Sequence, residues 1–288
     1  MKPGTRVIAL MCALSLLAVS GCSGGADVVP TRQPGIQETA TPPAPPPEST
    51  RILAYFTRGE QVGVGARTSA ASGTEALAEA AMEALLAGPT AEEREFGLGT
   101  TIPEGTRLNG VAVDDGVATV DLSPEFASGG GSLSMLLRVT QVVCTLTQFS
   151  DVDRVAFALD GEKATSIGGE GIVVDPPVDR AAFEGQLPAI LIEYPAPGET
   201  VASPLTAWGS SNVFEATHQL NVTDPDGLII VDTFVTATSG TGTRGTWSET
   251  VEFGPIKRAG LGAVIVFELS AKDGSQQNIV EIPVQMTE

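Results

Sequence analysis

Short apolar runs rich in β-branched residues recur through the first half of the chain, between residues 51 and 175. They predict five strands there, at 51–56, 62–64, 108–113, 117–122 and 155–159. The sequence Asp-Asp-Gly at 114–116 separates the third and fourth strands and is typical of a hairpin turn.

Two stretches in the same half have the period of helices. Residues 72–75 (SGTE) have the spacing of a capping box and predict a helix that Gly88 and Pro89 end. Ser132 is expected to cap a second helix, which runs to about Phe149. The order strand, helix, hairpin, helix, strand predicts an α+β domain over 51–175, with helices on one face of a largely antiparallel sheet.

The pattern changes after 175–177 (Asp-Pro-Pro), and from residue 187 onward it contains no helix signal. Seven short strands are predicted, at 190–192, 205–208, 218–222, 228–237, 246–253, 263–269 and 279–286. Turns rich in Asp, Gly and Ser separate them, so we expect an all-β immunoglobulin-like sandwich over 187–288. Six bulky residues are expected in its core: Trp208, Phe214, Phe234, Trp247, Phe253 and Phe267.

The first 21 residues have the layout of a secretory signal peptide. Lys2 and Arg6 precede an apolar stretch of about 13 residues, which is too short to span a bilayer core. Cys22 directly follows small residues and resembles the lipobox of bacterial lipoproteins, in which a diacylglycerol alkylates the thiol. We therefore expect fatty acyl chains such as palmitate on Cys22 and a location on the extracytoplasmic face of the cell membrane. The alternative is a secreted protein in which Cys22 has no role.

Residues 22–50 combine this cysteine with a proline-rich segment, in which seven prolines lie between Pro30 and Pro47. Few large apolar residues are present, so the segment is expected to be a disordered linker that favours extended polyproline II. It would hold the two domains away from the bilayer.

The chain carries a formal net charge of −19. Such acidity excludes a nucleic-acid partner, because no basic surface is available to displace phosphate counterions. It also argues against electrostatic adhesion to anionic lipid, so the acyl chains on Cys22 are expected to provide the membrane anchor. A charged surface also keeps an exported domain in solution.

Few residues offer catalytic or metal-binding chemistry. His218 is the only histidine, and we expect it at the surface or at a strand edge. Cys144 lies in a helical apolar stripe and is expected to be a buried hydrophobe rather than a reactive thiol. One histidine and one free cysteine do not make a zinc site, and the aspartates at 114–115 and 224–226 are expected to be turn residues. We therefore predict no catalytic, cofactor-binding or metal-ligating residue, although a pair of carboxylates for glycoside hydrolysis remains open.

Motifs in both halves carry a resemblance to known families. The first half resembles the GerMN domain of sporulation and spore germination proteins over about 51–162, through EALLAGP at 83–89, IPEGT at 102–106, DGVATVDLSPEF at 115–126 and TQVVCTLT at 140–147. The second half is similar to the immunoglobulin-like domain of bacterial spore germination proteins, through SPLT at 203–206, NVFEA at 212–216 and SAKDGS at 270–275. The tandem looks like envelope lipoproteins of Gram-positive bacteria, including actinobacteria that never sporulate.

This resemblance implies a role in envelope assembly or in processes related to sporulation and germination, and it transfers no catalytic residue. The leading hypothesis is a non-enzymatic interaction or scaffold module whose partners are membrane or envelope proteins. The alternative is a module that binds cell-wall glycan or another extracellular ligand through stacked aromatic residues, for which the sequence offers Tyr55, Tyr194, Trp208 and Trp247. A cell-wall hydrolase is the third hypothesis.

Overall fold

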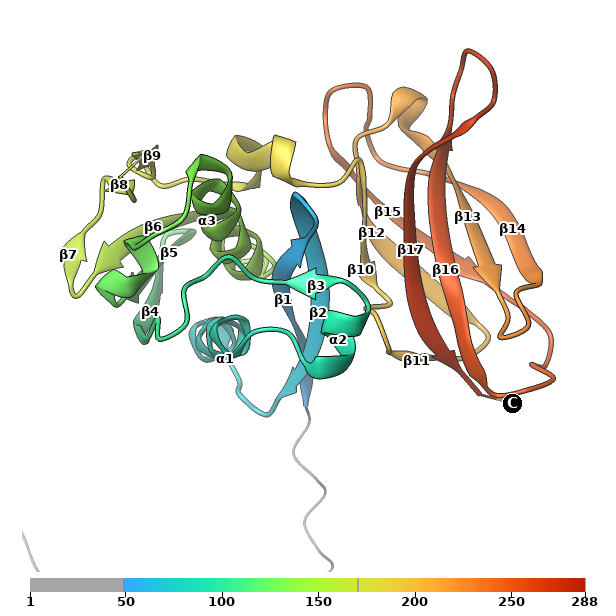
Figure 1. Ribbon diagram of the computed structural model, residues 1–288, viewed down its shortest axis with the longest axis horizontal. Helices are drawn as coiled ribbons and strands as arrows, with labels where there is room; N and C mark the ends of the chain where they lie inside the picture. Colours follow the sequence, from blue (N-terminus) through green and yellow to red (C-terminus); the bar gives the residue numbers. More distant parts are fainter. Residues whose placement is uncertain (1–48, 170, 288) are drawn as a thin grey trace, which may run out of the picture. The chain divides into compact units, whose positions relative to one another are not determined.

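The computed structural model describes residues 49–169 and 171–287. The predicted signal peptide, Cys22 and nearly all of the linker lie outside this range. An α+β half precedes an all-β half in the described part (Figure 1). None of the helices in it is both long enough and apolar enough to cross a bilayer.

The α+β half begins with a hairpin of β1 (Thr50–Arg58) and β2 (Gln61–Ser69). The connection is two residues long, and Gly59 takes the positive φ of 64° that such a turn requires. The short strand β3 (Leu98–Gly99) pairs with the far side of β1, which leaves β2 at an edge of this sheet.

A second sheet contains four strands in the order β4-β5-β6-β7: β4 (Leu108–Asp114), β5 (Val117–Leu122), β6 (Arg154–Leu159) and β7 (Glu162–Lys163). β5 and β6 are parallel because helix α3 (Ser132–Leu146) forms the crossover between them. The predicted α+β class is confirmed. The strands predicted to form one sheet instead form two, and the second sheet includes this parallel pair in addition to antiparallel pairs.

The caps of the helices differ from the prediction. Gly73, not Ser72, is the N-cap of α1 (Thr74–Ala87), and it has no side chain with which to cap. The capping box is instead formed by Thr90 and Glu93 around α2 (Ala91–Glu95), a helix that the pattern did not predict. Helix α3 has Gly131 as its N-cap and ends at Leu146, three residues before the predicted end, so Ser132 is its first residue rather than its cap.

The all-β half is the predicted immunoglobulin-like sandwich, and all seven predicted strands are present. One sheet has the order β10-β12-β15: β10 (Ile190–Tyr194), β12 (Leu205–Ser211) and β15 (Gly245–Val251). The other has the order β11-β17-β16-β13-β14: β11 (Thr200–Val201), β17 (Gln276–Met286), β16 (Gly260–Leu269), β13 (Thr217–Thr223) and β14 (Ile229–Thr236). The connection between the halves contains β8 (Ser166–Ile167), β9 (Ile172–Val173) and the 3-10 helix η2 (Arg180–Gln186).

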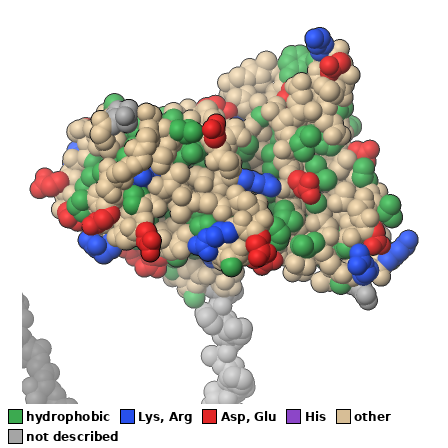
Figure 2. All heavy atoms as spheres, viewed as in Figure 1, with side chains coloured by type: hydrophobic (Ala, Val, Ile, Leu, Met, Phe, Trp, Pro, Cys, Tyr) green, Lys and Arg blue, Asp and Glu red, His purple; other side chains and the backbone are tan. Residues whose placement is uncertain are grey.

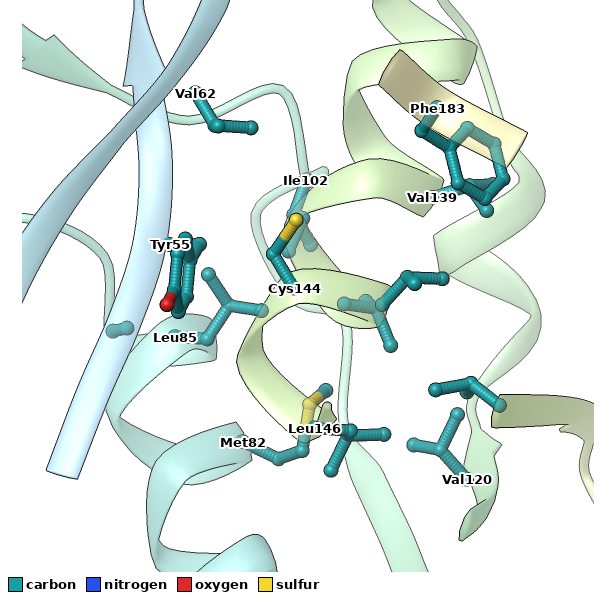
Figure 3. Packing of buried hydrophobic residues seen from close by; sticks show 14 of the residues in the cluster. Tyr55, Val62, Met82, Leu85, Ile102, Val120, Val139, Cys144, Leu146 and Phe183 are labelled. Carbon is teal, nitrogen blue, oxygen red and sulfur yellow. The ribbon is translucent and has the colours of Figure 1, made fainter. Parts of the chain in front are cut away.

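Each half has its own apolar core. In the first core, Cys144 of α3 lies among Tyr55, Leu85 and Ile102 (Figure 3). The expected core of the sandwich was wrong for several aromatics. Phe234 is 65% exposed because it pairs with Gln219 on the outward face of its sheet, and Phe214 is 53% exposed in the loop between β12 and β13.

Two further aromatic predictions differ in detail. Trp247 is buried in the sandwich core and Phe253 packs against it, as expected. Trp208, however, packs against the core of the α+β half. Phe267 of β16 is buried but belongs to neither core, and it pairs with Gln219 of β13.

Candidate functional site

A buried network of polar groups joins strand β1 to η2 and β10. The hydroxyl of Tyr55 donates to the carboxylate of Glu193, and Arg180 donates from Nη1 to Glu193 Oε1 at 2.9 Å. Nη2 of Arg180 reaches the carbonyl oxygen of Cys144 at 2.9 Å, and its Nε reaches Thr147 Oγ1 at 2.8 Å. Burial raises the pKa of Tyr55, so the phenol remains a proton donor at neutral pH.

Arg51 makes a second link at the start of β1. Its Nε and Nη2 donate to the two carboxylate oxygens of Glu199, each at 2.9 Å, in a bidentate ion pair. The guanidinium also lies over the rings of Tyr194 and Trp208, at 5.1 Å and 5.9 Å from their centroids. This pair links β1 to the segment just before β11, and the Tyr55–Arg180–Glu193 network links β1 to β10.

The last turn of helix α3 and the residues just after it cover one edge of strand β1. The side-chain amide of Gln148 accepts from the backbone N–H of Leu53 and donates to its carbonyl oxygen, at 2.7 and 2.8 Å. Thr145 Oγ1 accepts from the backbone N–H of Tyr55 at 3.1 Å. The backbone groups of Leu53 and Tyr55 therefore point away from β2.

The same register turns the backbone groups at the opposite edge of the hairpin away from β1, at residues that are only 2% and 3% exposed. Tyr55 pairs with Val64, and Thr57 with Val62. The backbone groups of Val62 and Val64 must then point away from β1, since paired residues in these positions do not bond to each other. Neither residue makes another backbone hydrogen bond within the described part of the chain.

Strand β17 of the sandwich has a similar open edge. Pro283 has no N–H, so it occupies a position that does not bond to β16, and its carbonyl oxygen accepts outward from Gly198 N at 2.8 Å. Glu281, two residues earlier, must have the same orientation. Because β11 pairs only with Gln285 and Met286, it does not cover Glu281.

These two edges line one open groove of about 400 Å³, which we call the β2–β17 groove. Its accessible surface is mixed polar and apolar, and its lining residues are Arg58, Gln61, Val62, Gly63, Val64, Leu98, Pro188, Leu191, Ile192, Pro197, Ile279, Val280, Glu281 and Ile282. Ile279 is 56% exposed. The volume lies in the range of ligand pockets in proteins.

Charge on the molecular surface is mixed. Figure 2 shows acidic and basic side chains scattered over one face with polar and apolar surface between them, and no patch of a single sign dominates this face.

The structure describes three of the residues that the sequence singled out: Cys144, Asp224 and His218. Cys22 lies outside the described residues. Cys144 is a buried hydrophobe, as predicted, and burial raises the pKa of its thiol to about 11. Asp224 Oδ1 accepts from the backbone N–H groups of Asp226 and Leu228, both at 2.9 Å, which confirms its role in the turn.

The expectation for His218 was wrong. It is 1% exposed and lies in the core of the sandwich, edge-on to Trp247 with 5.1 Å between ring centroids. Both of its ring nitrogens lack a hydrogen-bond partner within the described residues. His218 alternates in phase with Leu220 and Val222 of β13, and that signal in the sequence was sufficient to place it inside.

The aromatic residues considered for glycan binding do not form an exposed platform. Tyr55 and Trp247 are buried, and the rings of Tyr194 and Trp208 are partly buried beneath Arg51. This arrangement leaves none of the four free for stacking on a sugar.

The sequence did not indicate that a groove forms here or that Arg58 lines it. An arginine that ends an apolar strand before a Gly-Glu turn is normally a solvated residue, and the groove joins four separated parts of the chain. The signals available were the glycines at 63 and 65, which remove two successive side chains from one face of β2. A Cβ on Gly63 would meet Leu98 Cδ2 at 2.6 Å.

Both halves match known protein families. Residues 53–165 match the family described as sporulation and spore germination (Germane), and residues 189–275 match the immunoglobulin-like domain of bacterial spore germination (Gmad2). The chain is similar to spore germination protein GerM of Bacillus subtilis (strain 168), with 26% identity over 203 residues, 61% of this chain and 55% of the relative. It thus spans about half the length of this curated relative.

Solved structures show similarity to the same relative. The first GerMN domain of the sporulation protein GerM from Bacillus subtilis is 26% identical, with a TM-score of 0.36, over 45% of this chain and 98% of that one. The tandem GerMN domains of the same protein are 14% identical, with a TM-score of 0.38, over 71% of this chain and 62% of that one. By the two family matches, the chain carries a sporulation and spore germination domain followed by an immunoglobulin-like domain of bacterial spore germination.

Proposed function

We propose that the protein is a non-enzymatic interaction module, tethered to the extracytoplasmic face of the cell membrane through lipid on Cys22, that binds membrane or envelope proteins. The family supports a role in germination-type or envelope processes. The lipobox-like run before Cys22 supports the tether.

The observation that carries the proposal is the β2–β17 groove with its two open strand edges. Unpaired backbone groups at a strand edge bind an extended segment of another protein through main-chain hydrogen bonds, and adjoining apolar pockets select its side chains. Glu281 of β17 is an exposed residue with such groups, and the outward groups of Val62 and Val64 on β2 belong to groove-lining residues that are 2% and 3% exposed. Ile279, which is 56% exposed, supplies apolar surface at the rim of the groove.

The ionic links between the halves suit this role. Arg51 of β1 pairs with Glu199, just before β11, and Tyr55 of β1 and Arg180 of η2 both bond to Glu193 of β10, so these links hold the two halves together before a partner arrives. A preorganised site loses less conformational entropy on binding than one that must be assembled.

The proposal is tested in living cells of the host. The full chain, carrying a C-terminal tag, is crosslinked to its neighbours, and the captured proteins are identified by mass spectrometry. The variant Ile279→Glu places a charge at the rim of the groove, where the side chain is already exposed. Phe234→Glu is the matched control, since it makes the same change at another exposed apolar residue, which does not line the groove.

We expect a defined membrane or envelope protein to be captured by the native chain and by Phe234→Glu, and to be lost with Ile279→Glu. Equal capture by all three chains would contradict a role for the groove. A tether through Cys22 predicts that Cys22→Ser releases the chain from the membrane fraction.

A further inference from the structure

Three large apolar side chains are exposed together at one end of the sandwich. Leu228 directly precedes β14 and Ile229 begins it, and they are 57% and 60% exposed. Ile229 and Ala263 both pair with Thr223 of β13, so they lie on one face of the sheet. Leu261, which is 48% exposed, lies on the same face because it is two residues from Ala263 on β16. We call Leu228, Ile229 and Leu261 the sandwich tip.

Hydrogen bonds give the turn at the sandwich tip a fixed shape. Asp224 Oδ1 accepts from the backbone N–H of Leu228 at 2.9 Å. Nη2 of Arg258 donates to the carbonyl oxygen of Pro225 at 3.1 Å and to Oδ1 of Asp226 at 2.8 Å. The turn before β14 is therefore bonded to the segment before β16, and docking of the tip would cost little conformational entropy.

The charges beside the sandwich tip cancel one another. Lys257 and Arg258 are exposed cations of the segment between β15 and β16. Asp226 pairs with Arg258, and Glu252 is an exposed carboxylate of the same segment. Unlike the chain as a whole, which carries a net charge of −19, this neighbourhood does not repel an anionic lipid surface. The apolar side chains therefore determine what the tip contacts.

The sandwich tip lies at the same end of the molecule as the beginning of β1. Leu261 pairs with Gln285 of β17, and the backbone N–H of Gln285 donates to the carbonyl oxygen of Glu199 at 2.9 Å. The carboxylate of Glu199 holds Arg51, the second residue of β1, in the bidentate ion pair. Figure 1 shows the start of β1 and the end of β17 on the same side of the molecule. The segment that leads from Cys22 joins β1 at this end.

A tether at this end makes the bilayer the surface that the sandwich tip meets. Lipid on Cys22 would hold the chain at the membrane, so that contact between the tip and the bilayer becomes intramolecular. A contact that is weak from solution is then populated, because the tether raises its effective concentration. The tip is a turn rather than a groove, and exposed apolar side chains on a turn can enter the bilayer interface without a complementary pocket.

We propose that the sandwich tip inserts into the headgroup region of the membrane to which Cys22 tethers the chain. This inference rests on the proposed tether and is independent of the β2–β17 groove. It adds a second membrane contact, which sets the side of the protein that faces the bilayer. Ile279 and Met286 are separated along β17 by about 23 Å, at ~3.3 Å per residue, so docking would hold the rim of the groove clear of the membrane.

The test uses the full chain, purified from its host in a mild detergent and reconstituted into vesicles of phosphatidylcholine and phosphatidylglycerol in equal amounts. Leu228→Cys carries an environment-sensitive fluorophore on the new thiol. Cys144 does not compete for the label, because it is buried and its thiol pKa is raised to about 11. Phe214→Cys is the matched control, since Phe214 is a similarly exposed apolar residue before β13, at the opposite end of the sandwich.

We expect the label at position 228 to shift its emission to shorter wavelength in the vesicles. Lipid with brominated acyl chains should quench this emission, and the label at position 214 should show neither effect. Replacing both Ile229 and Leu261 by Asp in the Leu228→Cys chain should abolish the shift and the quenching, and urea unfolding checks that this variant remains folded. Added salt should change the signal little, because the charges beside the tip cancel.

Flotation of the vesicles separates failure of the tip from failure of the tether. A chain that floats with the vesicles but keeps an unshifted label at position 228 would overturn the inference and leave the tether intact. A chain that does not float would overturn both. The comparison of Ile279→Glu with Phe234→Glu judges the groove independently of either result.

Two further outcomes would replace the bilayer by another occupant and so overturn the inference. A shift seen only in membranes isolated from the host, and not in the lipid vesicles, would identify a membrane protein as the partner of the sandwich tip. A shift that grows with the ratio of protein to lipid would identify a second copy of the chain.

Discussion

His218 makes the stability of the sandwich depend on pH. Its ring is buried beside Trp247 without a hydrogen-bond partner among the described residues, and burial lowers its pKa from 6.5 to about 4. The folded chain therefore keeps the ring neutral between pH 6.5 and 4, whereas the unfolded chain binds a proton in that range. Stability is full above pH 6.5 and falls as the pH falls toward 4.

The magnitude follows from the two pKa values. At about 1.4 kcal/mol for each pH unit, the gap between them corresponds to a total of about 3 kcal/mol, of which about 2 kcal/mol is lost between pH 7 and pH 5. The carboxylates whose pKa is lowered, such as Glu93 and Glu184, start from 4.5 and lose their contribution mainly below this window.

Urea unfolding at several pH values between 5 and 7, at constant ionic strength, measures the effect through tryptophan fluorescence. In His218→Leu the slope over this window should disappear, and stability at pH 7 should equal or exceed that of the native chain because two unpaired buried nitrogens are removed. The control Gln219→Thr alters the neighbouring residue on the outward face and should keep the slope.

The reasoning is refuted if the slope survives in His218→Leu, or if the native chain is equally stable at pH 7 and pH 5. A direct check is the NMR titration of the ring, which is unambiguous because the chain has a single histidine. A midpoint near 6.5 in the folded chain would also contradict the account.

Three more predictions concern the core and its polar links. Replacing Glu193 by Ala leaves Arg180 and Tyr55 without their acceptor, and calorimetry should show a free energy of unfolding about 3 kcal/mol lower. A decrease below about 1 kcal/mol would mean that the network contributes little to stability. The thiol of Cys144 should resist alkylation by iodoacetamide at pH 8 in the folded chain and react after denaturation, as peptide mass spectrometry would show; rapid labelling in the folded state would contradict its burial. Thr90→Ala removes the capping box of α2 and should cost about 1 kcal/mol in urea unfolding, and an unchanged midpoint would show that the box is dispensable.

Local sequence patterns were sufficient for most of the fold. The seven strands of the sandwich follow from alternation and turn residues, because each strand buries one face and local turn chemistry ends it. Helix caps were less predictable. The pattern at 72–75 fits a capping box with Ser72 as the N-cap. The N-cap is instead Gly73, whose φ of 85° is a backbone conformation that glycine adopts without strain.

The groove could not be predicted, since it depends on how distant segments meet. Arg58, Leu98, Leu191 and Ile282 are adjacent only in the folded chain. Strand edges are a property of sheet order, and nothing in the run QVGVG at 61–65 indicates that β2 ends its sheet. The exposed Phe234 shows the same limit. An aromatic residue in a strand is predicted to be buried unless it is known which face of the sheet its position occupies.

Site-specific photocrosslinking tests most directly whether the β2–β17 groove is the surface that meets a partner. A benzophenone amino acid replaces Ile279 at the rim of the groove in one full-length chain and Phe234 in another, and both chains are irradiated in living cells. The account predicts a discrete protein adduct from position 279 and none from position 234. An adduct from position 234 alone, or none from position 279, would contradict it.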